Sequence, residues 1–114
     1  MTKRFAPALT PPYYMAVMST HFDGDPEVRA QLVGEGLRLA ALNPDFLGAE
    51  RVDEETGFAL SVSYWKTREA FNTWSEEAFA WARKEFNRPE GSTMFSQRVV
   101  RIARVDEVRC MSTD

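Results

Sequence analysis

A chain of 114 residues, 44% of them hydrophobic and 27% charged, has the size and composition of one soluble globular domain. The 14 basic and 17 acidic residues give a net charge of −3, which argues against nucleic acid as a partner because phosphate binding requires a basic face. No apolar run approaches the roughly 18 residues of a membrane-spanning helix. We find no signal-peptide core and no basic amphipathic segment, and the lone Cys110 can form neither an internal disulfide nor a zinc site, so we expect a cytoplasmic protein without membrane contact.

The first part of the chain predicts an arm, a strand and a helix. Residues 1–12 contain three prolines and predict a loose arm. Residues 13–20 are bulky and apolar on both faces, which is typical of a strand covered on both sides. Asp25 is a good N-cap before Pro26 at the first helical position, so a helix should run from Pro26 to Leu42.

Two glycines, Gly34 and Gly36, lie inside this predicted helix and weaken it. We expect both to allow the close approach of another backbone. Asn43-Pro44-Asp45 then ends the helix.

The middle of the chain predicts a hairpin. Residues 46–52 and 58–65 form strands, and the polar turn 53–57 between them ends in a glycine. On the second of these strands, one face has four large side chains, from Phe58, Leu60, Val62 and Tyr64. The other face has small side chains and Trp65.

The last part predicts a helix and a long strand. Thr67 caps a helical region that extends to Phe86, and Ser75 followed by two acidic residues resembles a fresh N-cap, so a bend is expected there. Residues 87–92 form a loop and residues 93–105 a final strand. The predicted domain therefore covers residues 13–106 and is followed by a polar tail, 107–114.

The element order β-α-β-β-α-β has a direct topological consequence. Right-handed crossovers convert it into a four-stranded antiparallel sheet with both helices on one face. The second face, to which the third strand contributes small groups and Trp65, is then uncovered although the first strand is apolar on both sides. A second copy of the chain is the simplest cover, so we expect a homodimer through the sheet faces.

Three segments resemble one protein family. PDFLGAERV (44–52), SVSYWKTREAFNTW (61–74) and RIARV (101–105) resemble the antibiotic biosynthesis monooxygenase (ABM) domain proteins. The resemblance covers residues 13–106. It implies an α+β, ferredoxin-like domain that dimerises into an α/β barrel, with a pocket between sheet and helices. Some family members oxidise polycyclic aromatic molecules with oxygen and no bound cofactor, and others degrade heme.

The chain departs from the family at positions that matter for chemistry. Heme-degrading members have a first-strand asparagine where this chain has Met18, and a helix histidine that ligates iron. Many other members have the helix histidine and a Trp-Tyr pair, which align here with Ala80 and with Met94-Phe95. Heme degradation is therefore disfavoured.

Six residues are candidates for the site, and four of them have a structural alternative. His21 is a candidate base, or a surface histidine. Tyr64 could donate a hydrogen bond to a ligand, and Arg98 could hold a phenolate, unless it points outward as an edge charge. Trp74 and Trp81, two helical turns apart, could stack on an aromatic ligand together with Met18, or pack in the core.

Two functions remain open at this stage. The first is a cofactor-independent monooxygenase that acts on an electron-rich aromatic small molecule. The alternative is a non-catalytic small-molecule binder or stress-related dimer of the same fold. The absence of the helix histidine and of the Trp-Tyr pair favours this alternative.

Overall fold

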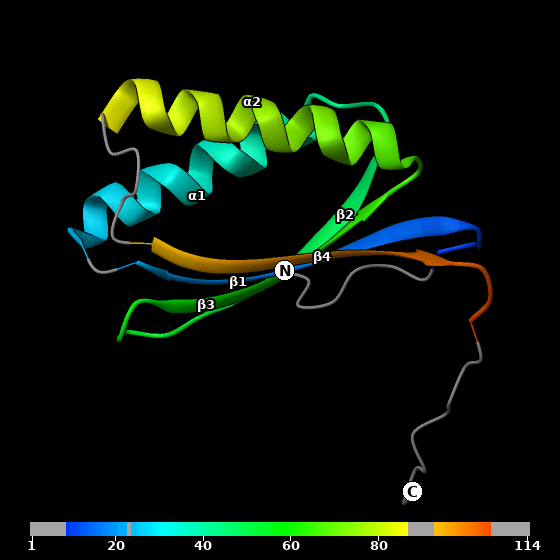
Figure 1. Ribbon diagram of the computed structural model, residues 1–114, viewed down its shortest axis with the longest axis horizontal. Helices are drawn as coiled ribbons and strands as arrows, with labels where there is room; N and C mark the ends of the chain where they lie inside the picture. The colour runs from blue at the N-terminus through cyan, green and yellow to red at the C-terminus, as the bar shows by residue number, and fades with distance from the viewer. Residues whose placement is uncertain (1–8, 23, 87–92, 106–114) are drawn as a thin grey trace, which may run out of the picture.

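The computed structural model describes residues 9–22, 24–86 and 93–105, which form two helices lying together on one side of a curved sheet (Figure 1). The elements are β1 (Tyr13–Phe22), α1 (Pro26–Ala41), β2 (Phe46–Asp53), β3 (Phe58–Trp65), α2 (Arg68–Phe86) and β4 (Thr93–Ile102). Most of the predicted arm, the loop 87–92, the tail 107–114 and Cys110 lie outside the described residues. No helix in the described part is long and apolar enough to cross a membrane.

The sheet has the strand order β2-β3-β1-β4, so β1 and β3 are central and β2 and β4 form the edges. Each neighbouring pair is antiparallel. This is the ferredoxin-like arrangement, and it confirms the predicted fold class.

Both helices begin where the capping residues predict. The Asp25 side chain accepts a hydrogen bond from the Glu27 amide at 2.9 Å, and Pro26 takes the first helical position of α1. The Thr67 hydroxyl accepts from the Ala70 amide at 3.1 Å at the start of α2. These caps satisfy amide groups that have no partner inside the helix.

Two predicted features differ from the structure. The predicted division of this region at Ser75 is absent, because α2 is one continuous helix: Phe71 and Trp74 pack on the core with its inner face, while Glu76 and Glu77 are exposed outside. The last strand also ends at Ile102 rather than Val105.

The two faces of β3 are exchanged relative to the prediction. Trp65 is fully buried under α2, with its ring centroid 5.8 Å from that of Phe71 and 5.4 Å from that of Trp74. The small residues that share this face let the helices approach the sheet, and the large side chains point away from the helices. We call that opposite side the outer face. Strand register assigns to it Glu50 and Val52 of β2, Phe58, Leu60, Val62 and Tyr64 of β3, Met15, Val17, Ser19 and His21 of β1, and Arg98 and Val100 of β4.

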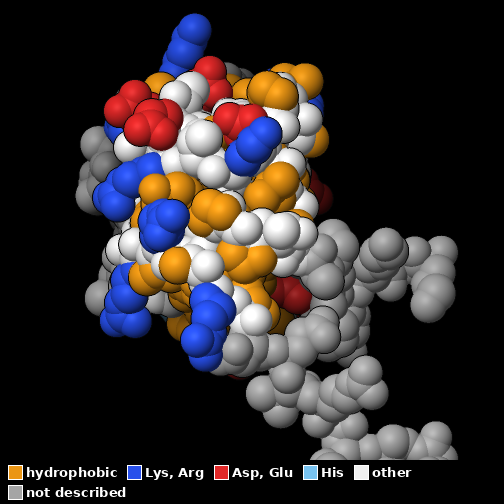
Figure 2. All heavy atoms as spheres, turned by 90° about the vertical axis from the view of Figure 1, so that its right-hand side faces the viewer, with side chains coloured by type: hydrophobic (Ala, Val, Ile, Leu, Met, Phe, Trp, Pro, Cys, Tyr) orange, Lys and Arg blue, Asp and Glu red, His pale blue; other side chains and the backbone are white. Residues whose placement is uncertain are grey.

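The core gathers at one end of the layer between sheet and helices. Its buried members are Ala16, Ala40, Trp65, Ala70 and Phe71, and Tyr14, Phe46, Trp74 and Val99 pack against them. We call this the packed end. Viewed from outside, it shows apolar side chains among Lys and Arg side chains (Figure 2).

The glycines of α1 have different surroundings. The Trp74 indole Nε1 donates a 2.8 Å hydrogen bond to the Gly36 carbonyl, and a Cβ on Gly36 would lie 3.9 Å from the same ring. A Cβ on Gly34 would meet nothing within 4 Å. The expectation that another backbone approaches both glycines is therefore wrong, since a side chain approaches one and open space adjoins the other.

Candidate functional site

The opposite half of the helix–sheet layer, beside the β2–β3 hairpin, is packed less completely. We call it the hairpin end. The C-terminal part of α2 and the N-terminal part of α1 lie over it (Figure 1). Ala40 is the one buried residue of α1, and within the described side chains of α2 none from Ser75 to Lys84 is buried.

The described lining of the hairpin end combines apolar side chains with two hydroxyl groups and is mostly half-buried, apart from Ala59 and Phe22, which are buried. Met18 and Thr20 of β1 and Ser61 of β3 lie on the helix-facing side of the sheet, and all three are half-buried. On the inner side of α2, the half-buried residues are Ala78, Phe79, Trp81 and Ala82. Half-buried apolar side chains on both walls make this end the candidate ligand site.

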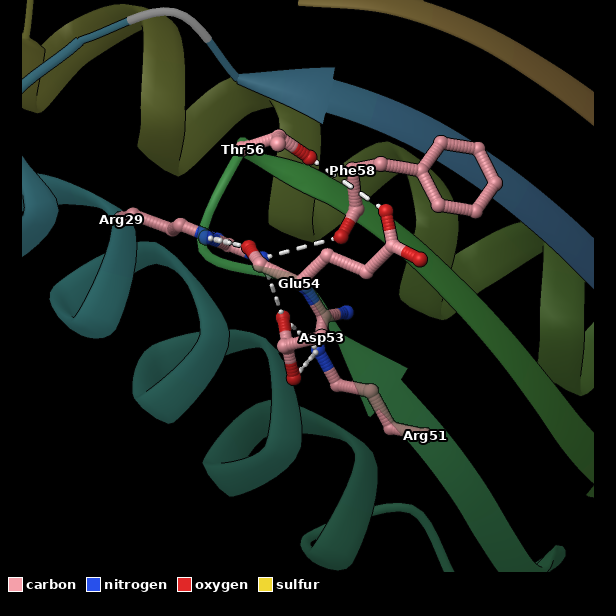
Figure 3. Close-up of polar contacts among 6 residues, drawn as sticks. All are labelled: Arg29, Arg51, Asp53, Glu54, Thr56 and Phe58. Carbon is pink, nitrogen blue, oxygen red and sulfur yellow. Dashed lines mark hydrogen bonds and ion pairs between the residues drawn. The ribbon is translucent and has the colours of Figure 1, made fainter.

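A polar cluster ties α1 to the hairpin at this end (Figure 3). The Arg29 guanidinium donates to the Asp53 carboxylate at 2.9 Å and to the backbone oxygens of Glu54 and Phe58 at 2.8 and 3.2 Å. Arg51 donates to the same carboxylate at 2.9 Å. Burial raises the pKa of Asp53, but the hydrogen bonds and charges of Arg51 and Arg29 outweigh that effect and hold this pKa below its usual value.

The sequence interpretation missed this cluster. It treated the acidic run Asp53-Glu54-Glu55 as a solvated turn. One signal was available, because Arg29 lies near the N-terminus of α1, where the helix dipole disfavours a positive charge. A cation placed there indicates a specific acidic partner.

A buried glycine at the end of the turn fixes the hairpin against β1. Gly57 has φ +101°, and its carbonyl accepts a 3.0 Å hydrogen bond from the Phe22 amide. A Cβ at this position would lie 2.1 Å from the Phe22 carbonyl oxygen. Backbone and ionic contacts therefore hold the hairpin against β1 and α1 at this end.

The structure divides the predicted site residues between the two sides of the sheet. Met18, Trp74 and Trp81 lie in the helix–sheet layer. Trp74 belongs to the packed end through its ring contacts and its hydrogen bond to Gly36, while Trp81 is half-buried two turns further along. Met18 and Trp81 are therefore the two predicted ligand contacts that occur at the hairpin end.

Tyr64 lies on the outer face, away from these residues. Its hydroxyl donates a 2.8 Å hydrogen bond to the Glu50 carboxylate, and its ring meets that of Tyr13 edge-on at 5.9 Å. Burial, followed by the hydrogen bond and charge of Glu50, raises the pKa of Tyr64 to about 12. The phenol therefore stays protonated at neutral pH and already uses its proton within the chain.

His21 and Arg98 also lie on the outer face, and both are exposed. His21 is paired with Phe58, six residues from Tyr64 along β3, which corresponds to about 20 Å at roughly 3.3 Å per residue. The three polar candidates therefore do not converge on one point, and the sheet separates them from Met18 and Trp81.

Comparison with known proteins places the chain among relatives of this fold. No protein-family model matches it. It is 34% identical over 99 residues to the uncharacterized protein YqjZ of Bacillus subtilis (strain 168), a match that covers 87% of this chain and 84% of that relative.

Solved structures with the same fold include three oxygenases or their relatives. SnoaB of Streptomyces nogalater, a cofactor-independent oxygenase, superposes with a TM-score of 0.64 at 14% identity over 84% of this chain and 97% of that chain. The monooxygenase ActVA-Orf6 of Streptomyces coelicolor, solved with nanaomycin D, gives 0.55 at 19% over 88% and 94%. A protein described as antibiotic biosynthesis monooxygenase gives 0.54 at 16% over 81% and 99%. The chain therefore belongs to the family of YqjZ, and its fold is that of the ABM domain, as the resemblance in sequence predicted.

Proposed function

We propose that this protein binds a planar aromatic small molecule between its sheet and helices, at the hairpin end, and oxidises it with molecular oxygen without a bound cofactor. The observation that carries the proposal is the half-buried apolar lining formed by Met18, Ala78, Trp81 and Ala82. A flat ligand would complete that burial, at about 25 cal/mol for each Å² of apolar surface removed from water. The oxygenases that share the fold support this choice of reaction.

The proposed chemistry requires little from the protein. An anthrone or electron-rich phenol, once deprotonated, donates electrons to oxygen itself. For an anthrone, the reacting CH₂ group loses two hydrogens and gains one oxygen atom as a carbonyl, and the second oxygen atom leaves as water. The pocket has to exclude water, orient the ring and stabilise the anion. Thr20 and Ser61 are the half-buried hydroxyl groups on the sheet side of this end.

A non-catalytic binder of the same molecules is the second candidate, and a specific observation favours it. His21, Tyr64 and Arg98, the side chains proposed to transfer a proton or hold an anion, lie on the outer face of the sheet. In this case the hairpin end binds the aromatic molecule without turning it over.

The proposal includes a homodimer through the outer face, in the cytoplasm. Four large apolar side chains are exposed on that face in the single chain: Val52, Phe58, Leu60 and Val100. An apolar sheet surface of this kind is normally covered, and a second identical surface is a suitable cover. The helix side is left free for the ligand.

The experiment separates binding from turnover. Titration of hydroxylated polyaromatics should quench the tryptophan fluorescence, and an oxygen electrode should record uptake with at least one of them. Ala78→Trp, which adds an indole to the inner side of α2, should weaken binding by about tenfold or more because it fills the space that the ligand would take.

The matched control is Ala80→Trp, which makes the same substitution on the exposed side of the helix and should leave binding unchanged. Quenching without oxygen uptake across the panel supports the binder and refutes the oxygenase. If neither variant weakens binding, the proposed site is refuted.

A further inference from the structure

Charged and apolar side chains on the outer face are arranged in rows that cross the strands. Antiparallel pairing aligns Glu50 with Val62, Val62 with Val17, and Val17 with Arg98. These four residues form one row across the sheet, from the edge strand β2 to the edge strand β4. An acid therefore lies at one end of the row, a base at the other, and two valines between them.

A half-turn of this row places its acidic end over the basic end of the original row. A two-fold axis parallel to the strands, passing between β3 and β1, places β2 of one copy over β4 of the other. The row has equal spacing on both sides of that axis, since neighbouring strands are about 4.8 Å apart. Glu50 then lies over the partner's Arg98, and Val62 over the partner's Val17.

We propose that Glu50 of each subunit pairs with Arg98 of the partner subunit, and that these two symmetric ion pairs fix the orientation in which the outer faces stack. The inference rests on the homodimer proposed above and specifies its geometry. Stacked sheets lie about 10 Å apart, a gap that these two long side chains can bridge from opposite sides. The Glu50 carboxylate can accept from Arg98 as well as from Tyr64, because it has about four acceptor positions.

Two positions in the neighbouring rows are complementary in size under the same rotation. In one row Gly48 aligns with Tyr64, Met15 and Val100, so Val100 of one copy, 44% exposed in the single chain, lies over the partner's Gly48. In the next row Leu60 aligns with Ser19, so each Leu60 lies over the partner's Ser19. At these two positions a large side chain therefore faces a small one, as interdigitating layers require, while Tyr64 faces the partner's Met15.

The other in-plane axis is disfavoured by charge. An axis running along the row would place β2 over the partner's β2, with Glu50 against the partner's Glu50 and Arg98 against the partner's Arg98. Like charges in contact across an interface are repulsive and exclude wrong arrangements. The two edge charges thus discriminate between the two ways of stacking the same apolar surface.

Charge reversal tests the pairing through the dimer dissociation constant, measured by sedimentation at low ionic strength. Arg98→Glu should raise this constant by about 100-fold, because both symmetric pairs change from attraction to repulsion. The double variant Glu50→Arg/Arg98→Glu should return it to within about threefold of the wild type, since the pairs are restored with exchanged signs. Arg101→Glu, on the opposite face of β4, is the control and should leave it unchanged.

Cross-linking tests the orientation directly. In a Cys110→Ser background, subunits with Glu50→Cys should be linked by a short bismaleimide to subunits with Arg98→Cys. Neither type of subunit should be linked to its own kind.

The possible results separate this inference from the proposed activity. Rescue by the double variant together with mixed cross-links supports it, whatever the oxygen electrode records. A chain that remains monomeric, an Arg98→Glu variant that dimerises like the wild type, a double variant as weak as Arg98→Glu, or links between identical subunits only would each overturn it.

Discussion

The two ends of the helix–sheet layer differ in burial and in the contacts that join the elements. At the packed end Trp65 is 0% exposed and contacts the rings of Phe46, Phe71 and Trp74. At the hairpin end the guanidinium of Arg29 attaches α1, and Gly57 joins the hairpin to β1. Most of the described side chains between helix and sheet are half-buried there, while Ala59 and Phe22 are buried.

This difference suits a small domain that must both fold and bind. Aromatic packing supplies free energy but fills the space that it stabilises. Ionic and backbone contacts at the rim attach α1 to the hairpin without placing a ring between helix and sheet. The comparison therefore predicts that stability depends mainly on one end and ligand binding mainly on the other.

The largest expected effect is at the packed end. Trp65→Ala should lower the free energy of unfolding by about 4 kcal/mol, the usual cost of truncating a fully buried tryptophan. Urea denaturation followed by circular dichroism measures it. Trp81→Ala, at the half-buried hairpin end, should cost about 1–2 kcal/mol by the same measurement. Equal losses in the two variants would contradict the division between the ends.

Gly57→Ala should have the next largest effect, at about 3 kcal/mol. Alanine is strained at φ +101°, and its Cβ would lie 2.1 Å from the Phe22 carbonyl oxygen. Gly34→Ala is the matched control, because a Cβ there meets nothing within 4 Å. In a helix that control should stabilise the protein by about 0.5–1 kcal/mol. Thermal unfolding of the two variants should therefore shift in opposite directions.

Arg29→Met should destabilise the protein by about 1–2 kcal/mol at neutral pH, because it leaves the Asp53 carboxylate and two hairpin carbonyls without this donor. The pKa of Asp53 is lowered in the folded chain, so the pair stabilises above the unfolded pKa of about 4 and its contribution is lost as the pH falls through the folded value. The difference between wild type and variant should narrow in acid. A difference that is constant from pH 7 to pH 3 would exclude the ionic contribution.

How much the sequence could predict depends on the range of each interaction. The caps at Asp25 and Thr67 are local, and they were predicted correctly together with the element order. Alternation along β3 separated Tyr64 from Trp65, but the prediction that the Trp65 face is uncovered was wrong, because the choice between the two faces is not a local property of the strand. That choice depends on Phe71 and Trp74 from α2, and the cluster at Arg29 likewise joins residues 24 positions apart.

Tyr64→Phe should have the smallest effect on stability. Tyr64 is next to Trp65 on the same strand but lies on the outer face. The loss should be about 1 kcal/mol at neutral pH, the usual contribution of one hydrogen bond to a charged acceptor at a partly exposed site. The pKa of Tyr64 is raised to about 12, so this contribution is present below pH 10 and is lost as the pH rises through the folded value. Ultraviolet titration should therefore show one tyrosine ionising late in the wild type and no such step in the variant. Glu50→Gln should move that step back toward pH 10, because the charge that opposes ionisation is gone. If the step stays near pH 12, burial alone raises the pKa of Tyr64 and Glu50 does not contribute.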